Sequence, residues 1–364
     1  MRIYGYTQIN GVFAKPTGVA KHIDQMFNRL GADPDIQFSM LLAADQRPEV
    51  SPLARLPAVF MPQPRRRLEW MWMLGGFPSV DPYVPDADWI YCPIERPIPS
   101  RRHRIACTVH SLYWFDRTLP GSENWRFTRM KFRLMLRPMI RHCAVIFTVS
   151  EFLKRQIVEW FGARREQIVV VGNGAEPEFF EASQAPVGVA GRPYVVVVSG
   201  LNYLDGAEYV LTTARALRQL DPDIRILVAG HQNESEYVEQ AREIPNIELL
   251  GYQHSRQLAK LMHDSVALLF LNRYESFGMG VVEAMAAGTP VIGTNFTAVP
   301  EIVGEAGIIA DVTKPEDIAR QIVELARTPS LRTHYIELGA RRAADFTWQA
   351  CVGRLIAALK HPIA

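Results

Sequence analysis

The sequence predicts an α/β fold built from two doubly wound, Rossmann-like domains, each with a mostly parallel sheet. Strand-length apolar runs alternate with helical patterns along the chain, which is typical of such sheets. Most runs are near-continuously apolar, as strands covered on both faces require. The chain has 364 residues, 48% of them hydrophobic, and this length fits two domains of common size. The predicted strands are residues 104–110, 144–149, 167–171, 194–199, 225–229, 266–271 and 290–293.

Two helices carry signals at both of their ends. Thr17 predicts the N-cap of a helix that closes at Gly31. The apolar stripe of this helix consists of Val19, Ile23, Met26, Phe27 and Leu30. Ser150 predicts the N-cap of a second helix, residues 151–161, which ends at Gly162.

The segment 176–192 has weak periodicity, two prolines and several small residues, so we predict that it joins the domains. The domains would then occupy residues 1–182 and 190–345. Charge differs along the chain. Residues 1–180 carry 24 Lys and Arg against 17 Asp and Glu, whereas residues 181–364 carry 16 against 21. The basic first half suits an anionic partner.

Several protein classes are disfavoured by composition. The N-terminal residues lack the apolar core of a signal peptide, and no apolar run reaches transmembrane length. The cysteines are scattered without paired spacing, so neither a disulfide framework nor a zinc site is expected. They are Cys92, Cys107, Cys143 and Cys351. We therefore expect a cytoplasmic protein without a bound metal.

Residues 269–290 say most about function. An apolar run of strand length ends in a polar loop, which opens into a helix of small residues. Glu275 and Glu283 stand eight positions apart across this turn. In open α/β sheets, ligands collect where strand ends give way to helix N-termini. Gly278 leaves room for a phosphate to approach helix N–H groups, and Glu283 could accept hydrogen bonds from vicinal hydroxyls.

These residues resemble the E-x7-E signature of retaining GT-B glycosyltransferases, the large glycosyltransferase family 4 ("glycosyl transferases group 1"). Two other stretches, residues 17–19 and 109–112, resemble those of bacterial mannosyltransferases. The alternative, an ordinary helix N-terminus with acids that favour its dipole, explains neither the loop glutamate nor the length of the match. The resemblance implies two domains facing a central crevice, with a last helix at 346–364 crossing back to the first domain. It implies that Glu275 lies beside the donor sugar and that Glu283 holds the nucleotide ribose. The residues it assigns to donor binding are Gly18, Gly200, Asn202, Tyr252, Arg273, Ser276, Phe277, Gly278, Met279 and Glu283, and those it assigns to catalysis are Glu275 and His110.

Other stretches extend the resemblance over most of the chain. Residues 16–20 match the early glycine loop, and residues 108–112 resemble the strand that ends in a histidine. Residues 146–152 and 171–174 match two further stretches, and Gly251-Tyr252 matches a loop beside the base. His110 has two interpretations. It could hydrogen-bond the donor sugar or leaving phosphate, or it could be a buried histidine bonded to backbone.

One departure from the family is marked. The loop after residues 194–199 usually holds an Arg and a Lys that neutralise the diphosphate, but here Asp205 takes the place of the Lys. No basic residue occurs from 193 to 213. Three explanations stay open: helix N-termini with Arg273 or a first-domain Arg replace the cations, a divalent metal bridges Asp205 and the phosphates, or the donor site is degenerate. We favour the first, because the E-x7-E region is intact.

Residues 125–141 form a basic segment without an acid. Arg126, Arg129, Arg133, Arg137 and Arg141 recur at helical spacing beside apolar residues. This pattern suits an interfacial helix on anionic lipid, and equally a solvated face over a core helix. Pro138 predicts a kink or break. The basic runs at 65–67 and 101–104 favour the membrane interpretation, since no nucleic-acid-binding motif accompanies them.

The sequence therefore predicts a retaining, metal-independent hexosyltransferase of cell-surface glycan biosynthesis, such as polysaccharide or lipopolysaccharide. The first donor hypothesis is GDP-mannose rather than a UDP- or dTDP-sugar. The acceptor would be lipid-linked or a growing polysaccharide, with an anionic membrane surface as a further partner and no cofactor or nucleic acid. The alternatives are a GT-B phosphorylase or synthase with a soluble acceptor, and a non-catalytic nucleotide- or sugar-binding homologue.

Overall fold

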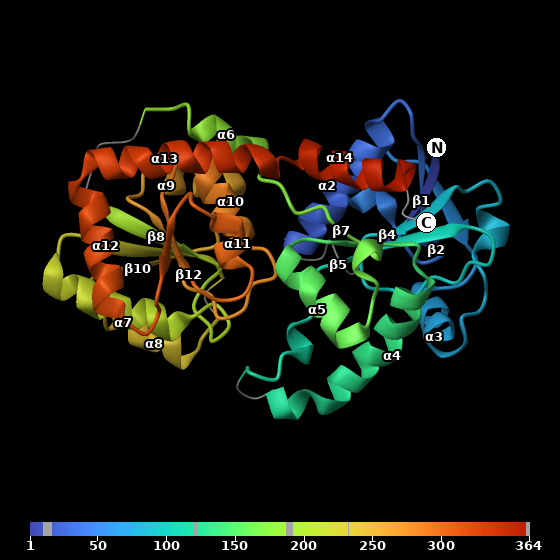
Figure 1. The fold of residues 1–364 in the computed structure, drawn as a ribbon, viewed down its shortest axis with the longest axis horizontal. Helices are drawn as coiled ribbons and strands as arrows, with labels where there is room; N and C mark the ends of the chain where they lie inside the picture. The colour runs from blue at the N-terminus through green and yellow to red at the C-terminus, as the bar shows by residue number, and fades with distance from the viewer. Residues whose placement is uncertain (10–16, 120–121, 187–191, 232, 362–364) are drawn as a thin grey trace. The chain divides into compact units, whose positions relative to one another are not determined.

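The computed structural model describes residues 1–9, 17–119, 122–186, 192–231 and 233–361. The chain divides into two compact units. Unit 1 consists of Met1–Gly172 and Trp348–Ala364, and unit 2 of Asn173–Thr347. Each unit contains one parallel sheet with helices around it (Figure 1).

Unit 1 has a seven-stranded sheet of order β3-β2-β1-β4-β5-β6-β7 in its described residues. All of its strand pairs are parallel. The strands are β1 (Arg2–Tyr6), β2 (Gln37–Ala43), β3 (Ala58–Met61), β4 (Trp89–Cys92), β5 (Arg104–Val109), β6 (Val145–Thr148) and β7 (Ile168–Val170). The α-helices are α2 (Gly18–Ala32), α3 (Arg65–Gly75), α4 (Arg126–His142), α5 (Glu151–Phe161) and α14 (Trp348–Lys360). Helix α14 packs beside α2 (Figure 1).

Unit 2 has a six-stranded sheet of order β10-β9-β8-β11-β12-β13 in its described residues. Its strands are β8 (Tyr194–Val198), β9 (Arg225–Ala229), β10 (Ile247–Gly251), β11 (Leu268–Phe270), β12 (Val291–Thr294) and β13 (Ile308–Ala310). Its α-helices are α6 (Pro177–Ala182), α7 (Ala207–Leu220), α8 (Glu236–Arg242), α9 (Ser255–His263), α10 (Met279–Ala286), α11 (Val299–Val303), α12 (Pro315–Arg327) and α13 (Pro329–Ala343). Chain order reverses between β8 and β11, which makes their carboxyl ends the switch point where ligands bind in open sheets.

The helix signals are confirmed, with one difference. The Thr17 side chain accepts from the N–H of Ala20 at 3.2 Å, and the Ser150 side chain caps α5. Gly162 ends α5 in the left-handed conformation. Gly31, in contrast, does not end α2 but lies inside it. A glycine is needed there because a Cβ would stand 2.5 Å from the Leu56 side chain. Its role is close packing.

The boundary between the units differs from the expected linker. Unit 2 already begins at Asn173, so it includes α6. Two contacts hold this segment to unit 2: the Ser255 hydroxyl donates to Glu176 at 2.7 Å, and His263 Nε2 bonds the Ala185 carbonyl at 2.9 Å. The weak periodicity of this segment therefore did not indicate a free linker, because Glu176 and Ala185 are bonded to unit 2. The C-terminal helix α14 belongs to unit 1, where the Trp89 indole N–H donates to the Leu359 carbonyl at 3.1 Å.

The turn from β8 into α7 depends on Gly206. This residue is the N-cap of α7 with φ +72°, and an added Cβ would overlap the Leu271 carbonyl. We predict that Gly206→Ala lowers the free energy of unfolding by about 3 kcal/mol or more, from strain and overlap together. The control is Gly162→Ala, with φ +69° but no atom within 4 Å of the added Cβ. It should lose only the strain, roughly 1–2 kcal/mol. Urea denaturation of both variants checks the difference, and equal losses would contradict it.

Candidate functional site

The carboxyl ends of β8 and β11 carry the first group of candidate residues. Residues 271–278 connect β11 to α10, and Gly278 caps α10 in the left-handed region with φ +96°. A Cβ on Gly280 would stand 2.7 Å from the Val198 side chain, so the first turn of α10 packs directly on the end of β8. Close packing thus brings the N-terminus of α10 beside the loop that follows β8.

Glu275 lies in the loop between β11 and α10 and is held at several points. The Thr297 hydroxyl accepts its backbone N–H at 3.0 Å, and the Asn272 side chain donates to its carboxylate at 3.2 Å. Burial raises the pKa of Glu275, while the backbone N–H groups of Phe277 and Gly278, which donate to the carboxylate, lower it in part. In this structure those two N–H groups therefore contact Glu275, although the resemblance assigned both residues to donor binding.

Asp205 forms a second carboxyl group at this switch point. Its backbone N–H donates to the Asn202 side chain at 3.0 Å, and the Asn202 amide donates to its carboxylate. Burial raises the pKa of Asp205 to about 6 against the effect of that hydrogen bond. The charge of Asp205 also raises the pKa of Glu275. The two carboxyl groups therefore interact across the ends of neighbouring strands.

Arg273 does not supply a free cation here. Its guanidinium stacks on Tyr203 and Tyr209, each 4.3 Å from the ring centroid, and pairs with Glu208. Its backbone N–H donates to the Leu204 carbonyl at 2.8 Å. The expectation that Arg273 replaces the missing cations therefore lacks support, because aromatic stacking and Glu208 already compensate its charge.

The ends of β8 and β9 approach each other closely. Gly200 has φ +104°, and a Cβ there would stand 2.6 Å from the His231 carbonyl oxygen. A Cβ on Gly230 would stand 2.6 Å from the Gly200 nitrogen. Ser199, which is not a glycine, also has a positive φ of 93°. Backbone strain of this kind gathers at ligand sites.

An aromatic cluster lies at the ends of β9 and β10. Tyr252, which is 44% exposed, stacks on His231 with ring centroids 5.1 Å apart. His254 meets Tyr252 edge-on at 5.3 Å. Exposed stacked rings suit a planar ligand such as a nucleobase. The sequence predicted only Tyr252. His231 and His254 could have been found as well, because His231 follows Gly230 at the end of β9 and His254 stands three residues after Gly251 at the end of β10.

Three of the remaining unit 2 candidates are buried, and the fourth, Met279, is partly buried. Glu283 is 5% exposed and lies in α10, and Ser276 and Phe277 are also buried. Phe277 packs edge-on against Phe346 at 5.6 Å. Met279 is the first residue of α10. Among the described residues, no group of three or more His, Cys, Asp or Glu is arranged to hold a metal ion.

His110 stands at the end of β5 in unit 1. Its Nε2 donates to the Pro93 carbonyl at 2.7 Å, and its backbone N–H donates to Glu95 at 2.5 Å. His22 lies edge-on to the ring at 4.6 Å. The bond to backbone matches the structural interpretation of this histidine. It also fixes the tautomer and leaves Nδ1 of the neutral ring as an acceptor. Gly18, the first residue of α2, lies one helical turn before His22, and Pro16 falls outside the described residues.

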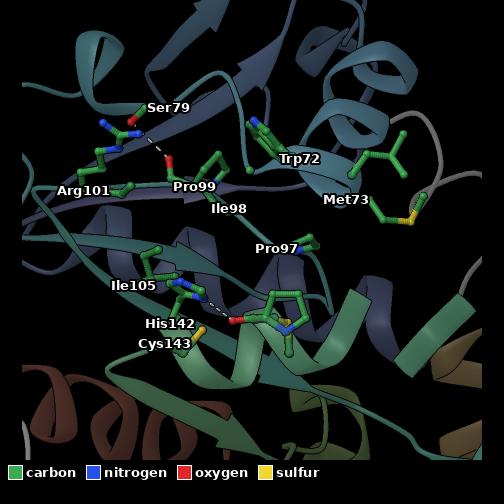
Figure 2. A pocket seen from close by; sticks show the side chains of 16 residues that line it. Trp72, Met73, Ser79, Pro97, Ile98, Pro99, Arg101, Ile105, His142 and Cys143 are labelled. Carbon is green, nitrogen blue, oxygen red and sulfur yellow. Dashed lines mark hydrogen bonds between the residues drawn. The ribbon is translucent and has the colours of Figure 1, made fainter. Parts of the chain in front are cut away.

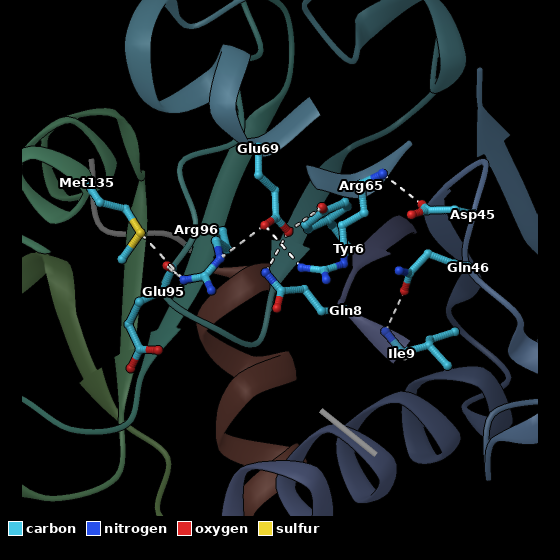
Figure 3. Close-up of polar contacts among 10 residues, drawn as sticks. All are labelled: Tyr6, Gln8, Ile9, Asp45, Gln46, Arg65, Glu69, Glu95, Arg96 and Met135. Atoms are coloured by element: carbon cyan, nitrogen blue, oxygen red, sulfur yellow. Dashed lines mark hydrogen bonds and ion pairs between the residues drawn. The ribbon is translucent and has the colours of Figure 1, made fainter. Parts of the chain in front are cut away.

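A polar cluster that the sequence did not predict surrounds Glu69 of α3 (Figure 3). Its carboxylate accepts from the Tyr6 hydroxyl at 3.0 Å and from the Gln8 amide at 2.5 Å. Arg65 and Arg96 lie within 3.4 and 3.8 Å of its other oxygen. Burial and Glu69 raise the pKa of Tyr6. The only signal for this cluster was a lone glutamate after three arginines, which sequence alone could not connect to β1.

Helix α4 differs from its predicted pattern in two respects. It continues through Pro138, so of the kink or break predicted there, the break does not occur. Arg129 and Arg133 lie partly buried, and each has a buried nitrogen without a hydrogen-bond partner in the described structure. The exposed face instead carries Phe127, Met130 and Leu134, which are 75%, 53% and 62% exposed, together with Arg126, Arg137 and Arg141. No described helix has the length and apolarity to span a bilayer.

Comparisons with known proteins cover nearly the whole chain. One family model, Glycosyltransferase Family 4, matches residues 16–179, and another, Glycosyl transferases group 1, matches residues 178–342. An O-antigen chain mannosyltransferase B from Escherichia coli is 25% identical over 75% of this chain and 74% of its own length.

Two solved structures share the fold. A glycosyltransferase from Rickettsia africae has a TM-score of 0.74 at 15% identity, covering 99% of this chain and 97% of its own. Anabaena Alr3699/HepE, solved in complex with UDP and glucose, has a TM-score of 0.69 at 17% identity, covering 99% of both chains. Together with the two family models and the paired parallel sheets, these likenesses identify the chain as a member of glycosyltransferase family 4 with the GT-B fold.

Proposed function

We propose that this glycosyltransferase moves a hexose, with retention, from a nucleotide-sugar to a lipid-linked or polysaccharide acceptor, and that the donor is GDP-mannose. The convergence of the Glu275 loop and the N-termini of α7 and α10 at the β8–β11 switch point carries the proposal. The similarity to the Escherichia coli mannosyltransferase supports the choice of sugar. Cell-surface glycan synthesis would be the corresponding process.

The proposed chemistry is a displacement on one face of the sugar. The bond from the anomeric carbon to the diphosphate oxygen breaks while an acceptor hydroxyl attacks from the same side, and its proton passes to the leaving phosphate. The partial positive charges of the α7 and α10 N-termini would stabilise the diphosphate without a metal. Glu275 would accept hydrogen bonds from sugar hydroxyls, Glu283 from the ribose, and Nδ1 of His110 from the sugar. Tyr252 would stack on the base.

The first test compares nucleotides by thermal shift, since a ligand that binds only the native state raises its melting temperature. We expect GDP to raise it more than UDP or dTDP, equally with and without EDTA. A larger shift with UDP, the nucleotide bound in the Anabaena structure, would replace the donor hypothesis. No shift with any nucleotide would favour a degenerate donor site, which Asp205 in the place of the family's Lys motivates.

Two variants then separate catalysis from nucleotide binding. Glu275→Ala should abolish transfer and leave the GDP shift nearly intact, because its carboxylate would act on the sugar. Glu283→Ala should reduce the GDP shift itself. Wild-type turnover in both variants would refute the assignment. A measured soluble acceptor, such as phosphate or a free sugar, would favour the phosphorylase or synthase alternative.

The charge of Asp205 predicts a pH dependence of donor binding. The pKa of this carboxyl is raised to about 6, so it is neutral below that pH and anionic above it. The phosphates of GDP-mannose stay ionised throughout this range. Donor affinity should therefore fall about tenfold as pH rises from 5 to 7.5, the equivalent of one pKa unit of interaction. Asp205→Asn should flatten this dependence and strengthen binding at pH 7.5.

The control for that experiment is Asp223→Asn, which removes an exposed acid elsewhere in unit 2. Calorimetric titration of this variant should show the same dependence of donor affinity on pH as the wild type. If Asp205→Asn keeps the same profile as well, another group titrates, and the carboxyl at 205 does not face the diphosphate.

We further propose that helix α4 attaches the protein to an anionic membrane surface. Its exposed face combines Phe127, Met130 and Leu134 with Arg126 and Arg137, the pattern of an interfacial helix. Arg126→Gln with Arg137→Gln should weaken sedimentation with anionic vesicles by roughly 1 kcal/mol per residue. Phe127→Ser with Leu134→Ser should weaken binding to neutral and anionic vesicles alike. Unchanged partitioning in both would leave α4 as a solvated helix.

A further inference from the structure

Two adjacent cavities lie between α3 and α4 of unit 1. The larger has a volume of about 560 Å³, within the usual range for small-molecule sites. Figure 2 shows Trp72 and Met73 on one side of it and His142 and Cys143 on the other, with Pro97 between them. The smaller has about 180 Å³. The cavities share Met73 and Pro97 in their walls.

The larger cavity presents a mainly apolar wall. Trp72, Ile98, Ile105 and Met139 line it and are themselves almost fully buried. The serines beside it are engaged elsewhere, since Ser79 and Ser100 donate to Asp81 at 2.7 and 2.5 Å, and His142 Nδ1 bonds the Pro138 carbonyl at 2.7 Å. A hydrocarbon chain against this wall would remove water from few polar groups, so its burial would be favourable.

The smaller cavity is basic. Arg66, Arg96 and Lys131 line it, with Glu69 as the acid. Glu69 already accepts from Tyr6 and Gln8 and lies beside Arg65 and Arg96 (Figure 3). Arg66 and Lys131 make no ion pair with any residue that the structure describes. Two cations are thus left for an anion, next to the aromatic rings of Trp70 and Phe132.

Exposed apolar side chains mark the same place. Trp70, Leu74 and Phe77 are 57%, 79% and 66% exposed within eight residues of chain. Trp70 lines the smaller cavity and Leu74 the larger. Such a cluster on a protein surface usually marks a binding site. Because this cluster borders both cavities, it indicates a ligand whose apolar part reaches from the cavities to the protein surface.

We propose that the two cavities bind one amphiphile, an alkyl or isoprenyl phosphate, with the phosphate at Arg66 and Lys131 and the hydrocarbon chain in the larger cavity. This rests on the proposed function in one respect: the amphiphile is the carrier of the sugar acceptor. Arg96, in the basic cavity, follows Glu95, which accepts the His110 N–H. The head-group end therefore lies next to the segment that holds the candidate catalytic histidine.

The test measures binding of three probes to the full chain by calorimetric titration: octyl phosphate, inorganic phosphate and 1-octanol. Octyl phosphate should bind at least about tenfold more tightly than either part alone, because only it fills both cavities. Equal affinity for inorganic phosphate would reduce the site to an anion pocket and overturn the proposal. Equal affinity for octanol would overturn the role of the cations, and absence of binding would overturn the whole site.

Substitutions of exposed residues locate the binding without disturbing the core. Arg66→Glu with Lys131→Glu should weaken octyl phosphate about tenfold or more and leave octanol unchanged. Leu74→Asp should weaken both. The matched controls are Arg164→Glu, an exposed arginine outside both cavities, and Val50→Asp, an apolar residue of unit 1 that is 83% exposed. Both should bind octyl phosphate as the wild type does, and a loss equal to that of the cavity variants would refute the location.

The site and the proposed function can fail separately. Nucleotide thermal shifts report on residues of unit 2, and none of the cavity variants should change them. Octyl phosphate binding without any nucleotide shift would retain the amphiphile site and refute the transferase proposal. A normal nucleotide shift without octyl phosphate binding would refute the amphiphile site alone.

Discussion

The candidate donor site depends on the pairing of β8 with β11. These strands stand about seventy residues apart in sequence and lie side by side in the sheet, with Leu268 opposite Val196. The backbone N–H of Val196 donates to the Ala267 carbonyl at 3.0 Å, and that of Val266 to Tyr194 at 2.8 Å. Because chain order reverses here, the loops that follow the two strands diverge and leave a crevice at the carboxyl ends of the strands. Gly206 and Gly280 let the following helices approach this edge without side-chain overlap.

The same pairing brings two acids together, and local hydrogen bonds hold each of them. Asn202 stands three residues before Asp205 and Asn272 three before Glu275, and each asparagine donates to its carboxylate. Buried carboxylates need such donors, because burial disfavours their charged form. The nearby Arg273 does not compensate the charge of these carboxylates, since two tyrosines and Glu208 hold its guanidinium. Neutral asparagine side chains, and not Arg273, therefore donate to these two acids.

The strongly patterned parts of this fold could be predicted from sequence. Buried strands such as β8 and β9 are continuous apolar runs, and caps such as Thr17 and Ser150 act within a few residues of their position. Among the strands that were not predicted, β10 and β13 are partly exposed and their apolar pattern is weak, whereas β2 and β4 are mostly or wholly buried. Gly31 shows a further limit of local rules, because its function depends on Leu56, a contact that only the fold creates.

Site residues divide along the same line. Glu275 and Gly278 belong to one contiguous stretch, and sequence alone was enough to single them out. The placement of Arg273 between Tyr203 and Tyr209, and of Glu69 between β1 and Arg96, arises from residues far apart in the chain. The orientation of α4 is intermediate: spacing predicted one basic face, but packing turned Arg129 and Arg133 inward and exposed apolar residues. Periodicity gives the faces of a helix, and only the neighbours decide which face is covered.

The attachment of α14 has a consequence for the order of folding. Unit 1 takes its last helix from residues that follow all of unit 2 in the chain. The Trp89 indole and the Val171 carbonyl, which bond Leu359 and Arg354, have no α14 partner until that helix has been synthesised. On a ribosome, unit 2 can therefore complete its sheet before unit 1 acquires its final element. The N-terminal unit, although made first, is the last to be finished.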